Sequence, residues 1–172
     1  MADYQQLSHR FSPVFSKKSR ILILGTFPSV KSREQNFYYG HPQNRFWKVL
    51  AEITKEPIPT NIQEKQQLLL SHHIAVWDVI HRCEIIGSSD SSIRNVVPAD
   101  LPRLLALTSV EAIFGNGAKA CQLFNTYTVP MLADYPELAQ IKKLPSTSPA
   151  NASWSLERLT ECWRKELSPY LS

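Results

Sequence analysis

Short apolar runs alternate with helix-like segments along most of this chain, and this alternation constrains the fold more than any other feature. The runs at residues 20–24, 74–80 and 110–114 are rich in aliphatic side chains, and a shorter run follows at 140–144. A strand that is apolar on both faces is typical of a parallel sheet with helices on both sides. Because helical patterns separate the runs, the sequence predicts an α/β domain with a parallel sheet.

Five segments carry the spacing or the start signals of helices: 44–54, 61–73, 100–107, 118–127 and 153–167. Thr60 or Asn61 is expected to cap the second of them, and Pro102 fits the first turn of the third. The sequence shows no repeat, low-complexity tract or linker. A length of 172 residues suits one domain with a real core, so residues 1–172 are predicted to form a single domain.

The composition is that of an ordinary globular protein, with 43% hydrophobic and 20% charged residues. No apolar stretch approaches the roughly 20 residues that a membrane span requires. The first six residues also lack the basic start and apolar block of a signal peptide. We therefore expect a cytoplasmic protein, nucleoid-associated in a bacterium or archaeon, without a membrane partner. The net charge of +4 fits a polyanionic partner but does not establish one.

The cysteines and histidines do not form a metal-binding pattern. Cys83, Cys121 and Cys162 are widely spaced and contain no Cys-x-x-Cys pair, so buried free thiols are expected. The adjacent histidines at positions 72 and 73 lack the spacing of metal ligands. We predict neither a metal nor another cofactor.

Functional residues in a parallel α/β sheet collect at the carboxyl ends of the strands. The segments at these ends are 25–29, 77–78, 115–117 and 145–151, and the loop at 40–44 is the natural fifth. These segments are therefore the ones to weigh as a site.

Each of these segments also has a plain structural interpretation. Residues 25–29 (Gly-Thr-Phe-Pro-Ser) match neither a dinucleotide fingerprint nor a phosphate loop, so they form either a tight turn or a ligand-facing loop. Asp78 either caps the next segment or reads the edge of a ligand, and we favour the second. Asp90 is most simply a turn or cap residue. Residues 145–149 (Pro-Ser-Thr-Ser-Pro) either grip phosphates or form a turn.

The aromatic loop at residues 37–47 contains a glycine and a proline, which make it stiff and irregular. At least one of the Tyr38 and Tyr39 rings is expected to be accessible, and stacking on a base is worth about 1–3 kcal/mol. Asn44 caps the following helix, orients a water in a pocket, or does both. His41 is expected to be a loop residue that forms hydrogen bonds.

Taken together, these pieces resemble the uracil-DNA glycosylase superfamily, and specifically its hypoxanthine-DNA glycosylase (DNA-deoxyinosine glycosylase) branch. The similarity runs from about Phe11 to the final helix, and the segment 41–47 is also similar to the mismatch-specific uracil glycosylase branch. The pieces that carry it are, in order, residues 21–29, Ser32, 37–47, 77–80, 87–93, 116–120 and 144–151.

The resemblance implies a three-layer α/β/α domain around a four-stranded parallel sheet, acting on double-stranded DNA that carries a deaminated base. The target nucleotide is expected to flip out of the stack into a pocket. The residues implied to bind the base are Tyr39, which stacks on it, with Phe27, Asp78, Gly25 and Thr26. The residues implied to contact DNA are Pro28, Ser29, Ser146, Thr147, Ser148, Pro149, Ala150 and Asn151.

Two departures from the family pattern shape the expected chemistry. Many relatives carry Asp or Asn to position water in the first motif, which corresponds to residues 25–29, where this chain has Phe27. Many relatives also carry His where this chain has Leu144. In the hypoxanthine branch the resemblance puts the essential amide at Asn44, which is the expected catalytic residue. The implied reaction is hydrolysis of the N-glycosidic bond through an oxocarbenium-like sugar by a monofunctional glycosylase.

Three alternative functions stay open from the sequence. One is excision of uracil from mispairs, favoured by the Asn-Arg-Phe-Trp step at 44–47 and opposed by Phe27. Another is a non-catalytic protein that binds DNA lesions. A third and weaker one is a small-molecule α/β hydrolase, which the absence of a nucleophile motif opposes. No obligatory protein partner is implied, and a monomer is expected.

Overall fold

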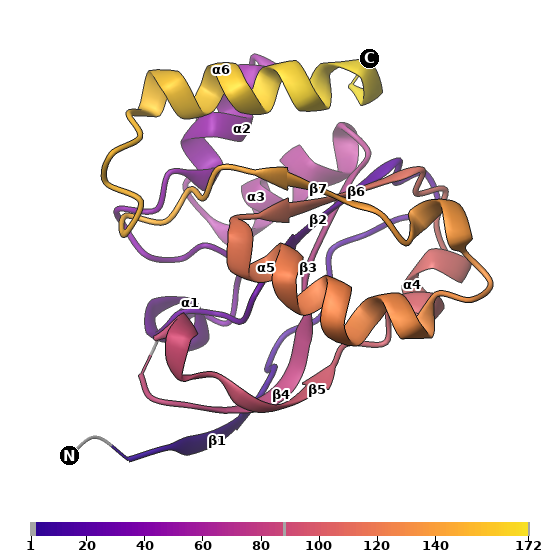
Figure 1. The fold of residues 1–172 in the computed structure, drawn as a ribbon. Coiled ribbons are helices and arrows are strands. Elements are labelled where there is room, and N and C mark those ends of the chain that lie inside the picture. The colour runs from indigo at the N-terminus through magenta and orange to yellow at the C-terminus, as the bar shows by residue number, and fades with distance from the viewer. Residues whose placement is uncertain (1–2, 88, 172) are drawn as a thin grey trace.

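The computed structural model describes residues 3–87 and 89–171, and its centre is a sheet of four parallel strands (Figure 1). The order across this sheet is β3 (Ile74–Asp78), β2 (Ile21–Gly25), β6 (Ala112–Asn116) and β7 (Ile141–Leu144). All three neighbouring pairs are parallel. The predicted α/β fold with a four-stranded parallel sheet is therefore confirmed.

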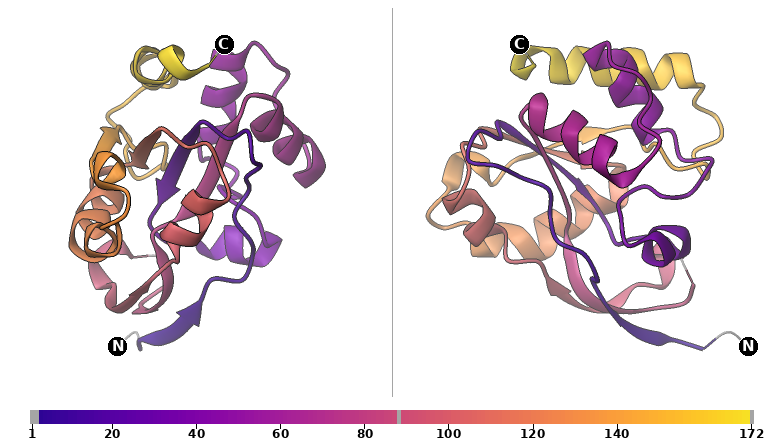
Figure 2. Two further views of the ribbon diagram at one scale, coloured as in Figure 1. Left: turned by 90° about the vertical axis from the view of Figure 1, so that its right-hand side faces the viewer. Right: turned by 180° about the vertical axis from the view of Figure 1, so that it is seen from behind.

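Helices cover both faces of this sheet because successive side chains of a strand point to opposite sides. In β2, Ile21 and Ile23 pack in the core beneath α2 (Phe46–Thr54), α3 (Ile62–Ser71) and α6 (Leu156–Leu167). Leu22 and Leu24 pack in a second core with α4 (Leu101–Ala106) and α5 (Ala118–Leu123). Figure 2 shows the resulting three layers from two further directions.

A second sheet, which the sequence did not predict, has three antiparallel strands in the order β1 (Gln5–Ser8), β4 (Ile80–Ile85) and β5 (Arg94–Pro98). The prediction of a single strand over residues 74–80 is wrong, because this apolar segment is divided between β3 of the parallel sheet and β4 of the antiparallel sheet. Backbone hydrogen bonds from Val79 N to Gly25 O (2.9 Å) and from Ile80 N to Thr26 O (3.2 Å) hold the chain where it leaves the parallel sheet.

The predicted helices are present, with shifted ends. Asn61 and Asp100 cap α3 and α4, and α6 begins only at Leu156 because Ser155 is its cap. The course of α5 continues as a π-helical turn, Phe124–Thr128. The sequence did not predict α1 (Val30–Gln35). Four 3₁₀ segments complete the described chain: Asp90–Ser92, Val129–Met131, Pro136–Leu138 and Ser168–Tyr170.

The three cysteines are free thiols, of which Cys83 is buried and the other two are half-buried. Over residues 3–87 and 89–171, none of the helices has the length and apolar character that crossing a bilayer would demand. In the same residues, no three histidine, cysteine or acidic side chains gather as a metal site would require.

Candidate active site

A cleft of about 530 Å³ opens at the carboxyl edge of the parallel sheet. Every residue that the sequence singled out for the site lines it, except Asn151. The cleft also contains Asn116, from the predicted strand-end segment 115–117, and several side chains that the sequence did not select. Those further residues are Val30, Lys31, Ser32, Tyr38, His41, Ile85, Ser89 and Asp90.

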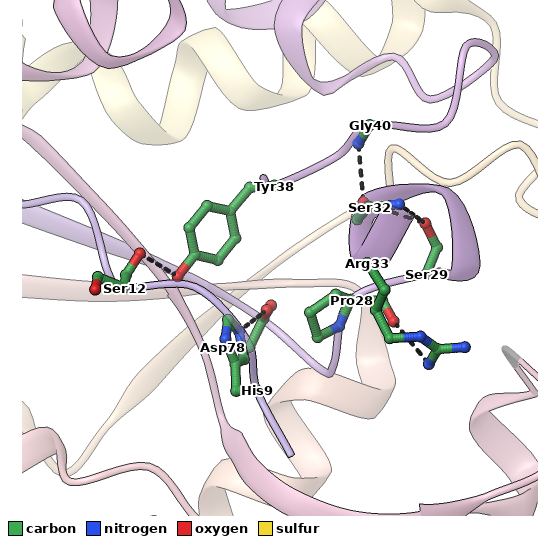
Figure 3. Close-up of polar contacts among 9 residues, drawn as sticks. All are labelled: His9, Ser12, Pro28, Ser29, Ser32, Arg33, Tyr38, Gly40 and Asp78. Carbon is green, nitrogen blue, oxygen red and sulfur yellow. Dashed lines mark hydrogen bonds and ion pairs between the residues drawn. The ribbon is translucent and has the colours of Figure 1, made fainter. Parts of the chain in front are cut away.

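Asp78 ends β3 at the floor of the cleft, and it is paired with a residue that sequence reasoning missed. The Asp78 Oδ2 atom lies 2.8 Å from His9 Nε2, and the two side chains are only 5% and 2% exposed (Figure 3). Gly25 lies beside them at the end of β2. An alanine Cβ at position 25 would overlap Asp78 Oδ1 and come within 3.0 Å of the Tyr39 hydroxyl. The absence of a side chain there lets the three groups converge.

Of the two tyrosines in the aromatic loop, Tyr39 is the one that reaches the cleft as an accessible ring. Tyr38 is 2% exposed and its hydroxyl donates to the Ser12 carbonyl at 3.0 Å, so it is a packing residue (Figure 3). Tyr39 is half-buried, with its ring stacked on Phe46 at a centroid separation of 3.9 Å. Burial and then the charge of Asp78 raise the pKa of the Tyr39 hydroxyl, which therefore stays neutral.

Asn44 supports the start of α2, although the residue at the helix cap is Arg45 and not Asn44 as the sequence suggested. The Asn44 Oδ1 atom accepts a hydrogen bond from the Phe46 backbone N–H at 2.9 Å, at the first residue of α2. The side chain is half-buried and also lines the cleft. A carbonyl oxygen has two lone pairs, so this bond leaves Asn44 one acceptor position and its amide N–H groups for a ligand or water.

The loop after β2 is held by α1, and this contact fixes the neighbouring aromatic loop. Ser29 caps α1 by accepting from the Ser32 backbone N–H at 3.2 Å. The Ser32 hydroxyl in turn accepts from the Gly40 backbone N–H at 2.9 Å (Figure 3). Phe27 lies between the guanidinium of Arg33, 5.9 Å from its ring centre, and the ring of His9. This places an apolar ring in the first motif, and a phenyl group cannot polarise water.

In the loop after β7, Thr147 holds the loop in place. Its side chain was expected to contact DNA, but it is not available for that contact. It is 0% exposed, its Oγ1 accepts from Asn116 Nδ2 at 2.9 Å, and its backbone N–H donates to Asn116 Oδ1 at 3.0 Å. Its carbonyl accepts from the Arg45 backbone N–H at 3.1 Å. All the polar atoms of Thr147 are therefore engaged within the protein.

Arg45 is a second residue whose role the sequence did not reveal. Its guanidinium donates to the backbone carbonyls of Ser148 (2.9 Å), Asn151 (3.0 Å) and Trp154. Because Arg45 directly follows Asn44, it ties the loop that carries the expected catalytic amide to the loop that is expected to contact DNA.

The cleft contains a second carboxylate, Asp90, at the start of the short helix Asp90–Ser92. Burial raises the pKa of this carboxyl, and the nearby ammonium of Lys119 partly opposes the rise. The segment 87–93 was part of the resemblance, and its Ser88 lies outside the described residues.

Comparison with known proteins agrees with this architecture. The family model described as "Uracil DNA glycosylase superfamily" matches residues 12–167. The chain belongs to this superfamily. The match covers the whole parallel sheet and every segment that forms the cleft, but it begins after His9.

Similar proteins come from two Methanosarcina species. The chain is 33% identical over 153 residues to a protein of Methanosarcina acetivorans named hypoxanthine DNA glycosylase, covering 88% of this chain and 92% of that one. It is 36% identical over 86 residues to a protein of the same name from Methanosarcina barkeri, covering 49% and 54%. A solution NMR structure from M. acetivorans, described as a candidate uracil DNA glycosylase, has a TM-score of 0.77 at 30% identity. That match covers 95% of this chain and 99% of the other.

Proposed function

We propose that this protein is a monofunctional DNA glycosylase that removes hypoxanthine from deoxyinosine in duplex DNA. The observation that carries the proposal is the single cleft that brings Tyr39, Asn44 and Asp78 together at the carboxyl edge of the sheet. Its volume falls within the range of about 300–1,000 Å³ that is usual for small-ligand sites. The likeness to proteins named hypoxanthine DNA glycosylase supports the choice of base.

In this proposal the target nucleotide leaves the stack and its base enters the cleft. The ring of Tyr39, supported from behind by Phe46, stacks on the base. Asp78 accepts a hydrogen bond from the base edge, and Gly25 leaves room for that approach. Residues 25–29 line the sugar side, and the exposed parts of the 146–151 loop lie along the DNA backbone.

Asn44 is proposed to position the attacking water through the acceptor capacity that remains after its hydrogen bond to the Phe46 N–H. It orients the water without removing its proton, because a side-chain amide is not a useful base at neutral pH. The departing purine leaves with the electron pair of the broken C1′–N9 bond, and the proton that the water loses as its oxygen bonds to C1′ reaches that purine through solvent. The deoxyribose cation that forms as the base departs is the electrophile that the water then meets. Positioning and fixed dipoles therefore supply most of the rate enhancement.

Excision of uracil is the second candidate, favoured by the Asn-Arg-Phe-Trp step at 44–47 and by the uracil description of the NMR neighbour. Two features oppose it. Phe27 provides no polar group in the first motif, and Leu144, where many relatives have histidine, is 0% exposed. Neither side chain offers a hydrogen bond to a departing pyrimidine anion.

The wider setting is proposed from the same arguments. The substrate is double-stranded DNA with a deaminated base, the protein acts as a monomer, and it works in the cytoplasm, at the nucleoid if the host is a bacterium or an archaeon.

The test uses duplexes that each carry one deoxyinosine, deoxyuridine or deoxyxanthosine, treated with alkali after incubation to cleave abasic sites. We expect strand breaks at deoxyinosine. Breaks at deoxyuridine alone would support uracil excision instead, and tight binding without any breaks would support a non-catalytic lesion binder.

A further inference from the structure

We propose that His9 is a positioning residue that holds the Asp78 carboxylate as the acceptor for the N1–H group of a flipped hypoxanthine. The inference rests on the proposed function, and it concerns a residue that precedes the part of the chain matched by the family model. It assigns to the N-terminal strand a part in selecting the base.

The His9 ring is fixed from several sides. The His9 backbone N–H donates to the His81 carbonyl in β4 at 2.7 Å, so the antiparallel sheet anchors its main chain. Its ring packs edge-on against Phe11 at 4.6 Å and lies 5.8 Å from Tyr38 and 6.0 Å from Phe27. An imidazole held this way has little rotational freedom, and it points Nε2 at Asp78 (Figure 3).

The positions of the hydrogen-bonding groups favour a proton on Nε2. His9 Nδ1 is buried and has no hydrogen-bond partner among the described residues. With the proton on Nε2, that nitrogen donates to Asp78 Oδ2, and Nδ1 carries only a lone pair. The other tautomer, with its proton on Nδ1, would leave a buried N–H at Nδ1 without an acceptor. A buried N–H without an acceptor costs more free energy than a buried lone pair without a donor.

Asp78 needs such a donor because a buried carboxylate is costly unless it is paired. In the described part of the chain, His9 is the one side chain hydrogen-bonded to it. The other groups around it provide no counter-charge. Tyr38 and Tyr39 are neutral hydroxyls, and Asp90 across the cleft repels it. Losing the His9 donor would leave the buried Asp78 carboxylate without its hydrogen-bonded partner and free to turn away from the base edge.

The orientation of this acceptor matters for base selection. Deamination of adenine changes N1 from a lone-pair acceptor into an N–H donor and turns the neighbouring amino group into a carbonyl. The Asp78 carboxylate, held by His9, accepts from hypoxanthine N1–H and repels the bare N1 of an undeaminated edge. A carboxylate that turns away from the base edge would lose that preference. His9 would therefore select the deaminated base through Asp78, without itself touching the base.

The test compares excision of hypoxanthine with excision of unsubstituted purine, whose N1 carries no hydrogen, from matched duplexes under single-turnover conditions. In His9→Phe we expect the rate ratio of hypoxanthine to purine to fall roughly 10- to 100-fold, as loss of a charge-assisted hydrogen bond predicts. His9→Gln, which keeps a neutral donor, should retain most of the ratio. His72→Phe removes a surface histidine paired with Glu56 at 3.1 Å and should leave the ratio unchanged.

A purely structural role for His9 would slow both substrates in proportion, and an unchanged ratio in His9→Phe would overturn the inference. If the wild type does not release hypoxanthine at all, the proposed function fails instead. Nitrogen-15 NMR of the wild-type imidazole gives an answer even if the variants do not fold. We expect a protonated Nε2 and a bare Nδ1 at His9, and a bare Nε2 would refute the assignment.

Discussion

The parallel and antiparallel sheets both reach the cleft, and they contribute to it differently. The ends of three parallel strands supply Gly25, Asp78 and Asn116, which form the floor and hold the loop above it. The antiparallel sheet contributes Ile85 of β4 to the lining. It also anchors the backbone of His9, which precedes the family's matched segment and lies against Asp78. We propose that the end of the parallel sheet carries the chemistry and that the antiparallel sheet helps to position it.

The largest difference between the sheets should appear in the rate of excision when a glycine is replaced by alanine at the end of β2 and in the connection between β4 and β5. Gly25→Ala puts a methyl group against Asp78 Oδ1 and near the Tyr39 hydroxyl. We expect single-turnover excision to slow by about 100-fold or more, because small displacements of reacting groups are costly.

Gly87→Ala, in the connection between β4 and β5, is the matched control. Its Cβ would meet nothing within 4 Å, but its φ of +60° should cost about 1–2 kcal/mol of stability. Excision by the folded protein should be unchanged. Wild-type activity in Gly25→Ala would contradict the convergence of groups at the floor of the cleft.

Asn116→Ala should produce the next largest effect, on stability. The substitution leaves the Thr147 backbone N–H and hydroxyl buried without their partner. We expect a loss of about 2–4 kcal/mol in the free energy of unfolding, measured by urea titration. Thr147→Val removes only the hydroxyl contact and should cost less. Equal losses in the two variants would show that the backbone contact to Asn116 Oδ1 contributes little.

Arg45→Lys should weaken DNA binding moderately. A lysine ammonium cannot span the carbonyls of Ser148, Asn151 and Trp154 as a planar guanidinium does. We expect the affinity for a deoxyinosine duplex, measured by fluorescence anisotropy, to fall by about 10-fold, or about 1.4 kcal/mol. Arg164→Lys alters a surface pair with Glu161 and should bind as the wild type does. Unaltered affinity in Arg45→Lys would show that the loop keeps its shape without this anchor.

Arg94→Ala on β5 should have the smallest effect. Arg94 lies over the Tyr4 ring at 3.5 Å and pairs with Glu84 at 3.4 Å, at an exposed position. Such surface contacts contribute less than about 1 kcal/mol each. We expect a small drop in the melting temperature and normal excision. A tenfold loss of excision would mean that the antiparallel sheet influences the cleft beyond His9 and Ile85.

The same contrast between the sheets explains how much the sequence could reveal. The parallel strands were predictable because their nearly continuous apolar character reflects burial on both faces. The antiparallel strands carry weaker signals, since β1 (Gln-Gln-Leu-Ser) is mostly polar and exposed and β5 ends in Pro98. The run 74–80 concealed the change of sheet at Val79, because both strands that it joins are apolar there.

Within the site, sequence reasoning identified the segments but not their connections. The strand-end rule and the resemblance pointed to residues that do line one cleft. His9 was missed because it lies 69 positions from Asp78 and no local pattern joins the two. The role of Arg45 depends on carbonyls more than 100 residues away, and a carbonyl leaves no mark in a sequence.

The most direct test of the proposed function measures the release of free hypoxanthine from a deoxyinosine duplex by mass spectrometry. The proteins compared are the wild type, Asn44→Ala and Asn44→Asp. The aspartate keeps an acceptor for the Phe46 N–H and thus controls for loss of that hydrogen bond at the start of α2. We expect hypoxanthine from the wild type, retained release from Asn44→Asp, and release at least about 100-fold slower from Asn44→Ala, with binding largely preserved. Wild-type release from Asn44→Ala, or no hypoxanthine from the wild type, would contradict the proposed mechanism.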